Sequence, residues 1–234
     1  MCLAINGLVA KPIWRRKIIM DGNAFFERLL WFIPVLLSLT VHEWAHAWTA
    51  WKLGDDTAKL MGRLSLNPLV HMDPIGTFLL PLMGVPFGWA KPVPVNPLRF
   101  NQGVSIRGGM LLVAVAGPIS NVCIAFVSWL LLFVVVRAGV LTDHPELASV
   151  VQLLVILVAI NIGLATFNMI PIPPLDGSKI ADALVPDSVR PAWNRFCELG
   201  PVLLIALILS PQLTGFSPIG DAVNAVLRLV LSTL

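Results

Sequence analysis

Two histidines and a glutamate in the first quarter of the chain have the residue types and spacing of a metal site. His42, Glu43 and His46 lie in the string HEWAH, which has the form HExxH. Residues four apart on a helix share one face, so both imidazoles can bind one Zn²⁺. The intervening carboxylate then lies close enough to act as a general base on a water at the metal. This spacing predicts a zinc-dependent hydrolase.

The segment that carries HEWAH is otherwise strongly apolar. Nearly all other residues between Arg28 and Lys52 are Leu, Ile, Val, Trp, Phe or Ala, which predicts a membrane-spanning helix over residues 29–51. Ionisable side chains inside a bilayer are costly and usually mark function. A single histidine there is more often a packing residue bonded to a neighbouring helix, but two histidines flanking a glutamate favour chemistry. We therefore expect hydrolysis within the membrane.

The composition is that of an integral membrane protein. The 234 residues are 57% hydrophobic and 12% charged, whereas soluble domains carry about 25% charged residues. The net charge of +3 comes from basic residues in short loops beside apolar segments. The positive-inside rule accounts for them, so no nucleic-acid partner is expected. The expected location is the cell membrane, crossed several times.

Further apolar segments must surround the metal helix. Spanning helices are predicted at 109–136 and 148–170, followed by a polar stretch at 176–198, an apolar segment at 199–213 and a last helix at 218–233. The fold class expected is an all-α polytopic membrane protein. It has a three-helix catalytic core, additional C-terminal membrane helices and a small β-strand or re-entrant element after the first helix.

That small element is predicted from three neighbouring patterns. Residues 57–66 alternate between apolar and polar side chains, which predicts a β-strand. Residues 74–90 are apolar but interrupted by Pro and Gly, which is typical of a re-entrant hairpin or a kinked short helix. The proline-rich residues 91–97 are expected to be extended, because each proline disfavours the helical region for the residue before it.

A catalytic zinc takes three protein ligands, so one more is needed beyond the two histidines. Asp176 is the acidic residue that stands out, because prolines precede it and Gly177 follows it. The prolines end the preceding helix, and the glycine permits a turn that aims the carboxylate back into the bundle. Equally, Asp176 could cap a helix that begins at Gly177. The residues alone leave both interpretations open.

Motifs spread over most of the chain resemble those of the site-2 protease family of intramembrane zinc metalloproteases. HEWAH is followed by FNMIPIPPLDG at 167–177, and residues 62–77, 89–97 and 116–121 read GRLSLNPLVHMDPIGT, WAKPVPVNP and AGPISN. They resemble the small bacterial branch of the family that lacks a PDZ domain. The resemblance covers roughly residues 29–185, which are the expected intramembrane metalloprotease core. A basic N-terminal arm at 1–28 is expected before this core and C-terminal membrane helices at 186–234 after it.

The resemblance also implies a set of site residues. One Zn²⁺ per chain would be bound by His42, His46 and Asp176, with Glu43 as general base and acid. Asn121, in AGPISN, would hold the substrate or stabilise the oxyanion. Without the resemblance, an interhelical hydrogen bond is the favoured interpretation of an asparagine at that position.

Two other residues have weaker assignments. The resemblance implies that Asn168 supports the loop that delivers Asp176. His71, in LVHMDP, is a candidate for orienting a metal ligand, although a loop histidine is more often solvated or simply hydrogen-bonded.

The expected function is hydrolysis of peptide bonds within or near the transmembrane segments of membrane proteins. The substrate helix must unwind, and residues 57–66 and 91–97 could offer edges for strand addition. The expected partners are a transmembrane protein substrate, the lipid bilayer and a regulatory protein not yet identified. The alternatives are an inactive homologue, which the presence of Glu43 disfavours, and a membrane metal-binding or transport protein. A transport protein needs more intramembrane acidic or histidine residues than this chain has.

Overall fold

The computed structural model of the chain describes residues 22–79, 90–139, 144–215 and 217–233. Within these ranges every regular element is a helix, and no strand is present. The elements are α2 (Gly22–Lys52), α3 (Thr57–Leu60), η2 (Pro68–Val70), η3 (Pro74–Leu79), η4 (Pro97–Arg99), α5 (Ile106–Arg137), η5 (Pro145–Leu147), α7 (Ala148–Asn168), α8 (Asp176–Leu184), η6 (Asp187–Val189), α9 (Arg190–Glu198), α10 (Gly200–Thr214) and α11 (Pro218–Leu231). The mostly helical architecture expected from the sequence is confirmed.

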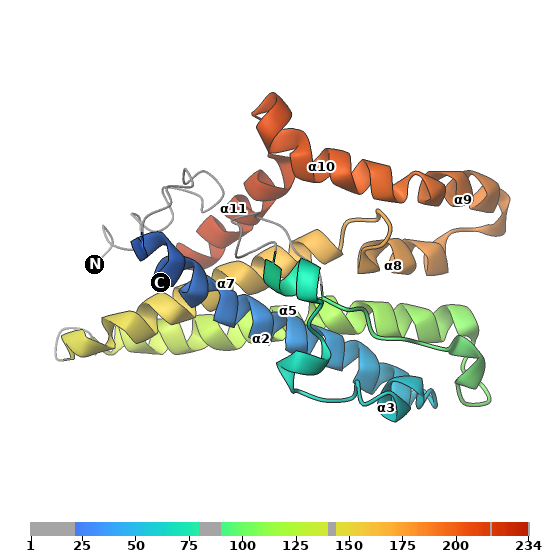
Figure 1. Ribbon diagram of the computed structural model, residues 1–234, viewed down its shortest axis with the longest axis horizontal. Helices are drawn as coiled ribbons and strands as arrows, with labels where there is room; N and C mark the ends of the chain where they lie inside the picture. Colours follow the sequence, from blue (N-terminus) through green and yellow to red (C-terminus); the bar gives the residue numbers. More distant parts are fainter. Residues whose placement is uncertain (1–21, 80–89, 140–143, 216, 234) are drawn as a thin grey trace.

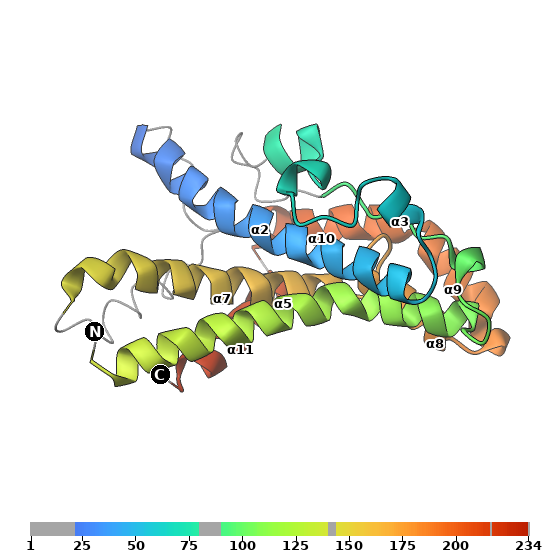
Figure 2. The same cartoon turned by 90° about the horizontal axis from the view of Figure 1, so that it is seen from below.

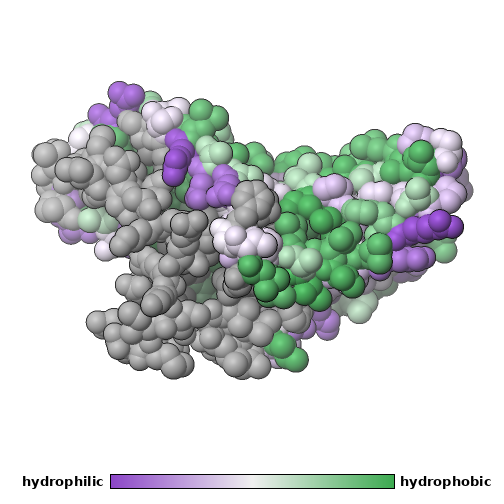
Figure 3. Space-filling model, turned by 90° about the horizontal axis from the view of Figure 1, so that it is seen from above, coloured by the Kyte–Doolittle hydropathy of each residue, from purple (hydrophilic) through white to green (hydrophobic). Residues whose placement is uncertain are grey.

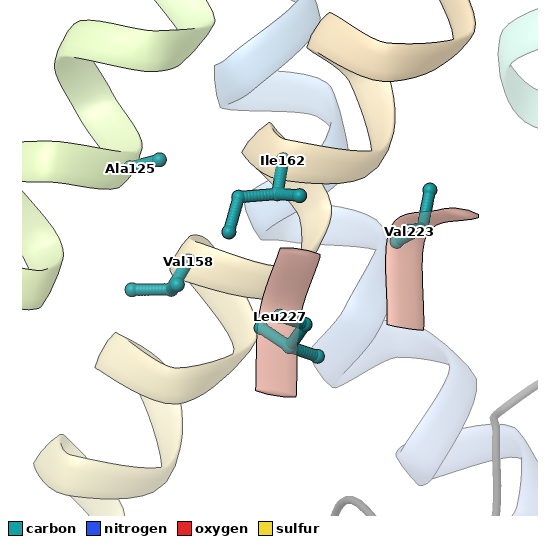
Figure 4. Packing of buried hydrophobic residues seen from close by; sticks show 5 residues of the cluster. All are labelled: Ala125, Val158, Ile162, Val223 and Leu227. Atoms are coloured by element: carbon teal, nitrogen blue, oxygen red, sulfur yellow. The ribbon is translucent and has the colours of Figure 1, made fainter. Parts of the chain in front are cut away.

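Three long helices form the centre of the molecule. α2, α5 and α7 each contact the other two, and α2 crosses the pair formed by α5 and α7 (Figure 2). α11 packs against α7 from the other side, where buried apolar side chains of three helices meet (Figure 4). That cluster consists of Ala125 from α5, Val158 and Ile162 from α7, and Val223 and Leu227 from α11. The metal motif on α2 is thus held against two helices that are themselves packed together.

Two of the described helices are long and apolar enough to cross a membrane, namely α5 and α7. α9, together with η6 before it, meets α10 at a bend of 57°. If these helices count as one broken span, a third span is present. Most apolar side chains of α5 face outward, because only 22% of its most apolar window is buried. α10 likewise presents a broad hydrophobic patch (Figure 3). These surfaces suit lipid rather than water.

The spanning helix predicted at 29–51 is observed as a helix within α2, which is not among the candidate membrane spans found in the described residues. Its second half carries the polar residues of HEWAH. A membrane crossing by α2 therefore stays a prediction.

The polar stretch at 176–198 forms short helices at one end of the bundle. α8 packs against α5, and an ion pair ties η6 to the start of the same helix. Arg107 Nη2 donates to Asp187 Oδ1 at 2.5 Å, and this hydrogen bond holds the pKa of Asp187 below its usual value. Arg190 and Trp193 of α9 both donate to Asp182 of α8. This end of the chain is therefore fastened by polar contacts rather than by an apolar core.

The β-strand predicted at 57–66 is wrong. These residues form the single turn α3 and a loop, and α3 ends in a Schellman motif. The Gly62 N–H donates to Lys59 O at 3.0 Å, and the Arg63 N–H donates to Ala58 O at 2.8 Å. Gly62 has φ +68°, a left-handed conformation that glycine adopts without strain. The alternating pattern misled because Gly62 counted as an apolar strand position, whereas it terminates a helix. Strand addition at 57–66 loses its basis.

Of the next two segments, the structure describes the proline-rich one in full and the apolar one in part. The proline-rich residues 91–96 form no helix or turn, and Asn96 has extended backbone angles, in line with the predicted extended conformation; η4 begins at Pro97. The apolar segment at 74–90 begins as η3, a single wide helical turn. The rest of the predicted re-entrant hairpin or kinked helix lies at 80–89, outside the described residues.

Candidate metal centre

The two histidines of HEWAH lie on the buried face of α2. The side chains of His42 and His46 are 4% and 8% exposed, so water has almost no access to either ring. Their Nε2 atoms are 3.1 Å apart, and the rings meet edge to face with centroids 4.7 Å apart. The helical spacing predicted from the sequence thus aims two potential ligand atoms at one point.

Asp176 reaches the same point from the opposite end of the chain. α7 ends at Asn168, and a proline-rich loop returns the backbone so that α8 begins at Asp176. Asp176 Oδ2 lies 3.1 Å from Nε2 of His42 and 3.1 Å from Nε2 of His46. Asp176 is inside α8 and makes no capping hydrogen bond, so the interpretation of this residue as a helix cap is not what the structure has.

Gly177 allows that return of the chain. A Cβ at this position would lie 2.3 Å from the carbonyl oxygen of Met169 and 2.5 Å from that of Ile170. Real Cβ atoms do not approach a backbone oxygen so closely, so only glycine fits against the end of α7. The Asp-Gly pair in the sequence therefore has a steric reason as well as a chemical one.

The protonation of the two imidazoles follows from what their other nitrogens contact. His46 Nδ1 lies 2.7 Å from Val113 O, a carbonyl that can only accept, so this nitrogen carries the proton. His42 Nδ1 lies 2.6 Å from Asn121 Oδ1, an acceptor in the assigned orientation of that amide. In the neutral imidazoles, each Nε2 then has a lone pair and no proton. Outward Nδ1–H donors of this kind orient metal-binding histidines in other proteins.

This donor set fits a zinc ion. His42, His46 and Asp176 are the group of the described residues whose ligand atoms could hold a metal, and all three are buried. Two bare nitrogens and a carboxylate oxygen, each 3.1 Å from the others, repel one another unless a cation lies between them. Ligands about 2.1 Å from a tetrahedral zinc lie about 3.4 Å apart, which is close to this spacing.

Gly117 of α5 makes room for the imidazoles. A Cβ on it would lie 2.4 Å from Nε2 of His46 and 2.6 Å from Nε2 of His42. The backbone of α5 therefore passes directly against the metal-facing edges of both rings. Any larger residue would occupy the space into which the ligand atoms point.

Lys179 holds the second oxygen of Asp176. Its Nζ lies 3.1 Å from Asp176 Oδ1, one helical turn further along α8, and the lysine side chain is 46% exposed. The contact leaves Oδ2 directed at the histidines. Among the described residues, this exposed lysine is the only group other than the two histidines that forms an ion pair with the buried carboxylate of Asp176.

Glu43 is held by the extended segment rather than by the metal ligands. Its Oε2 accepts a hydrogen bond of 3.1 Å from the backbone N–H of Val93. Arg63, itself 5% exposed, donates to the carbonyl oxygens of Lys91 and Pro92 and fixes that segment in turn. Glu43 is half-buried, unlike the three buried ligands. The orientation of its carboxylate is therefore set by the segment at 91–96.

Asn121 lies behind His42, fully buried on α5. Its Oδ1 contacts His42 Nδ1, and its Nδ2 donates to Asn161 Oδ1 at 2.8 Å. Asn161 in turn donates to Ser38 Oγ at 2.9 Å, which closes a polar chain across α5, α7 and α2. These contacts are the interhelical kind, and both ends of the Asn121 amide are occupied. The role at the oxyanion implied by the resemblance stays a prediction.

The two weaker candidates lie near the site without contacting the ligands. Asn168 Nδ2 donates to Leu164 O at 3.0 Å, at the end of α7 where the loop to Asp176 begins. His71 is buried, donates from Nε2 to Ser65 O at 2.8 Å and accepts at its backbone oxygen from the Lys91 N–H. Burial lowers the pKa of His71. His71 therefore supports the segment that holds Glu43 rather than a metal ligand.

Several residues that shape the centre were not singled out from the sequence. Asn161 had a detectable signal, because it is an amide in the middle of an apolar helix where polar groups are costly. Gly117 stands in the quoted AGPISN motif, but no sequence pattern showed that it would face imidazoles 71 and 75 positions earlier. Arg63 and Ser38 carried no signal of their own.

Comparison with known proteins gives the centre a family context. The model of peptidase family M50 matches residues 139–210. The "Putative zinc metalloprotease YwhC" of Bacillus subtilis is 41% identical over 179 residues, which cover 76% of this chain and 80% of that protein. Rip2 of Mycobacterium tuberculosis, named in the same way, is 28% identical over 181 residues, 77% of this chain and 67% of that protein. No solved structure matches the chain. With the His42, His46 and Asp176 group, these relatives identify Zn²⁺ as the cofactor.

Proposed function

Because the chain belongs to peptidase family M50, we propose that it is an intramembrane zinc metalloendopeptidase. It hydrolyses peptide bonds within or near the transmembrane segments of membrane proteins. The observation that carries the proposal is the convergence of His42, His46 and Asp176 on one buried point, beside Glu43 and among apolar helices. The proposed ligand and catalytic roles are those expected of the HExxH and LDG motifs.

The chemistry divides between the metal and the chain. Zn²⁺ supplies Lewis-acid activation of water and of the scissile carbonyl. Glu43 takes the proton of the attacking water and passes it to the departing amine. The Val93 N–H holds one oxygen of Glu43, so the other oxygen is available for the proton. Val113 O and Asn121 keep the metal-facing nitrogens of the two histidines free of protons.

The site has the surroundings that intramembrane proteolysis needs. The metal ligands are buried among helices whose outward faces are apolar, so the reaction takes place in a nearly dry environment. The proposed substrate is a transmembrane protein in the cell membrane, locally unwound at the scissile bond. Selection among substrates rests on the membrane site or on a separate regulatory protein.

Ion transport by the same cluster is the competing function. Neither α5 nor α7 carries an acidic residue or a histidine, so these two apolar helices offer no ionisable path across a bilayer. Nothing in the described residues favours transport over hydrolysis.

The substitution Glu43→Gln tests the proposal directly. The amide keeps the size of the side chain and its contact with Val93 but cannot accept a proton, so we expect zinc content to be unchanged. Cleavage should fall by at least about 100-fold, the usual contribution of a general base. Zinc content is measured by mass spectrometry of the purified protein, and cleavage by comparing membrane-protein fragments in cells.

Glu146→Gln is the matched control, because the Glu146 side chain is 67% exposed in η5 and, among the described residues, forms an ion pair with His144 alone. It should cleave like the wild type. Retained cleavage in the Glu43→Gln protein would contradict the proposal, as would zinc movement into vesicles that persists in the same variant.

A further inference from the structure

We propose that Asn161 of α7 is a positioning residue that sets the tautomer of His42, through a hydrogen-bond relay of fixed direction across three helices. The relay runs from the carbonyl of Leu157 to Asn161, then to Asn121 and then to His42. It keeps the proton of the neutral His42 imidazole on Nδ1, so that Nε2 is the nitrogen left to bind a metal. The inference rests on the proposed zinc site and deepens it, because it names the residue that prepares one ligand.

The direction of the relay originates at a backbone group. Leu157 O lies 2.9 Å from the Asn161 amide and can only accept a hydrogen bond. The NH₂ end of Asn161 must therefore face Leu157. The same nitrogen donates its second hydrogen to Ser38 Oγ at 2.9 Å. If the amide were turned round, two oxygens would face each other at this distance, so the orientation of Asn161 follows from chemistry and not from an assignment of atoms.

The orientation then passes to Asn121. With its NH₂ end engaged, Asn161 presents its oxygen to the Asn121 amide 2.8 Å away. Only the NH₂ end of Asn121 can donate to that oxygen, so the oxygen of Asn121 faces His42 Nδ1 at 2.6 Å. An oxygen there requires a proton on Nδ1. In a neutral imidazole, Nε2 is then the bare nitrogen that a metal needs.

The two histidines reach the same tautomer by different routes. His46 Nδ1 faces Val113 O, so a backbone carbonyl fixes its proton directly. His42 has an amide instead, and an amide can turn through 180° and offer a donor in place of an acceptor. His42 is therefore the ligand whose tautomer depends on a distant residue. Asn161 removes that ambiguity.

Burial makes the relay effective. Asn121 and Asn161 are both 0% exposed, and Ser38 is 1% exposed. Water cannot substitute for a missing partner at such positions, so loss of one member leaves the next without a defined orientation. The relay links α7, α5 and α2, the helices that form the centre of the bundle.

Tautomers in the metal-free protein provide the test. The full-length chain is labelled with ¹⁵N at histidine, stripped of metal with a chelator in detergent micelles and studied by NMR. The four histidines are assigned through single His-to-Gln variants. We expect wild-type His42 to carry its proton on Nδ1. Absence of a proton from Nδ1 of His42 in the metal-free wild type would overturn the inference.

Two substitutions at Asn161 separate positioning from packing. Asn161→Leu fills the space but removes the acceptor for Asn121, so we expect a mixed tautomer at His42. Zinc affinity should fall by about 10–100-fold, the usual effect of losing a partner that orients a ligand. Asn161→Asp keeps an oxygen facing Asn121, so the Nδ1 tautomer and most of the zinc affinity should be retained. A buried carboxyl group costs more stability than leucine, so thermal unfolding should rank these variants in the opposite order.

Thr40→Val is the matched control for the tautomer. Thr40 is buried on α2 and makes the same type of bond, 2.7 Å long, to the Leu36 carbonyl four residues earlier, but it is not part of the relay. It should leave the tautomer of His42 unchanged. If Asn161→Leu keeps both the wild-type tautomer and zinc affinity, or if zinc affinity simply follows unfolding temperature, the inference is wrong. If tautomer and zinc binding behave as stated while the wild type cleaves no membrane protein, the proposed function fails and this inference stands.

Discussion

Gly117 shows how closely the metal centre constrains single residues. The ligand atoms of both histidines lie within 2.6 Å of where its Cβ would be, so α5 can pass the site only with glycine at this position. Gly163 of α7 is a helical glycine of a different kind, because the nearest atom to its Cβ position is a methyl group 4.0 Å away. The two glycines lie in neighbouring apolar helices with opposite steric surroundings.

Gly117→Ala should weaken zinc binding. The added methyl group must displace the imidazoles, and such overpacking costs about 1–3 kcal/mol, equivalent to roughly a 5–150-fold loss of affinity. Zinc affinity is measured by competition with a coloured chelator. Gly163→Ala is the control and should bind zinc as the wild type does, with stability unchanged or slightly raised. Equal zinc affinity in both variants would contradict the close approach of α5 to the ligands.

At the scale of elements, the extended segment and the chain just after η4 are fastened to α2 and to the turn that follows α2. The Val93 N–H binds Glu43, the Asn96 N–H donates to Asp55 Oδ2 at 2.6 Å, and the Asn101 N–H donates to Leu53 O at 2.7 Å. Asp55 is fully buried, as a carboxylate with such fixed partners can be. We call residues 91–96 the strap, because they run along the second half of the metal helix. Arg63 donates to the carbonyl oxygens of the first two strap residues.

Arg63→Gln should lower cleavage while zinc content stays unchanged. Arg63 contacts the strap that orients Glu43, and among the described residues its side chain has no hydrogen bond to a metal ligand. Its loss should therefore misplace the general base and leave the ligands in place. We expect cleavage to fall by about tenfold or more, with destabilisation of about 1–3 kcal/mol from the carbonyls left without a donor. The measurements are turnover of a purified substrate, zinc content and thermal unfolding.

Arg99→Gln is the control for this prediction. Arg99 lies just after the strap in η4, is 45% exposed and pairs with Asp56 at 2.8 Å. Exposed ion pairs contribute at most about 1 kcal/mol, so turnover should stay near that of the wild type. If zinc is lost from the Arg63→Gln protein together with activity, the strap orients the ligands as well as Glu43.

For the whole molecule, the distribution of apolar surface decides how the chain lies in a bilayer. Only 22% of the most apolar window of α5 and 33% of that of α7 is buried, and the polar network that includes the metal ligands lies inside. This is the reverse of a soluble protein, whose exposed charged residues cover an apolar core. Cys123 is exposed on α5, close to the level of Asn121, and so reports on what surrounds that helix.

In a Cys2→Ser, Cys197→Ser background, Cys123 should resist a membrane-impermeant maleimide in intact membranes and react after denaturation in SDS. A thiol facing hydrocarbon is shielded although no protein atom covers it. His144→Cys, made in the same chain with Cys123→Ser, is the control, because His144 is 59% exposed between α5 and α7. Labelling is measured by gel shift. Reaction of Cys123 as fast as the control in intact membranes would show that α5 does not span.

The sequence by itself determined what depends on neighbours along the chain. The spacing of His42 and His46 sets both imidazoles on one helical face, and the long apolar runs become helices because only a helix satisfies their backbone groups in lipid. The extended form of the proline-rich strap also follows locally, from the geometry of proline. Gly62 is the local signal that was misread, since the same glycine suits an apolar strand position and a helix terminus.

The tertiary structure decided what depends on residues far apart in the chain. Asp176 is 134 residues from His42, and only the return of the chain through α7 and its loop brings the carboxylate within 3.1 Å of the imidazole on α2. The partner of Asn121 was undecided for the same reason, because an amide's direction depends on the groups that face it across helices. Gly117 and Asn161 gained their significance from packing alone. No periodicity encodes which side chain from one helix meets which from another, since that follows from how three helices cross.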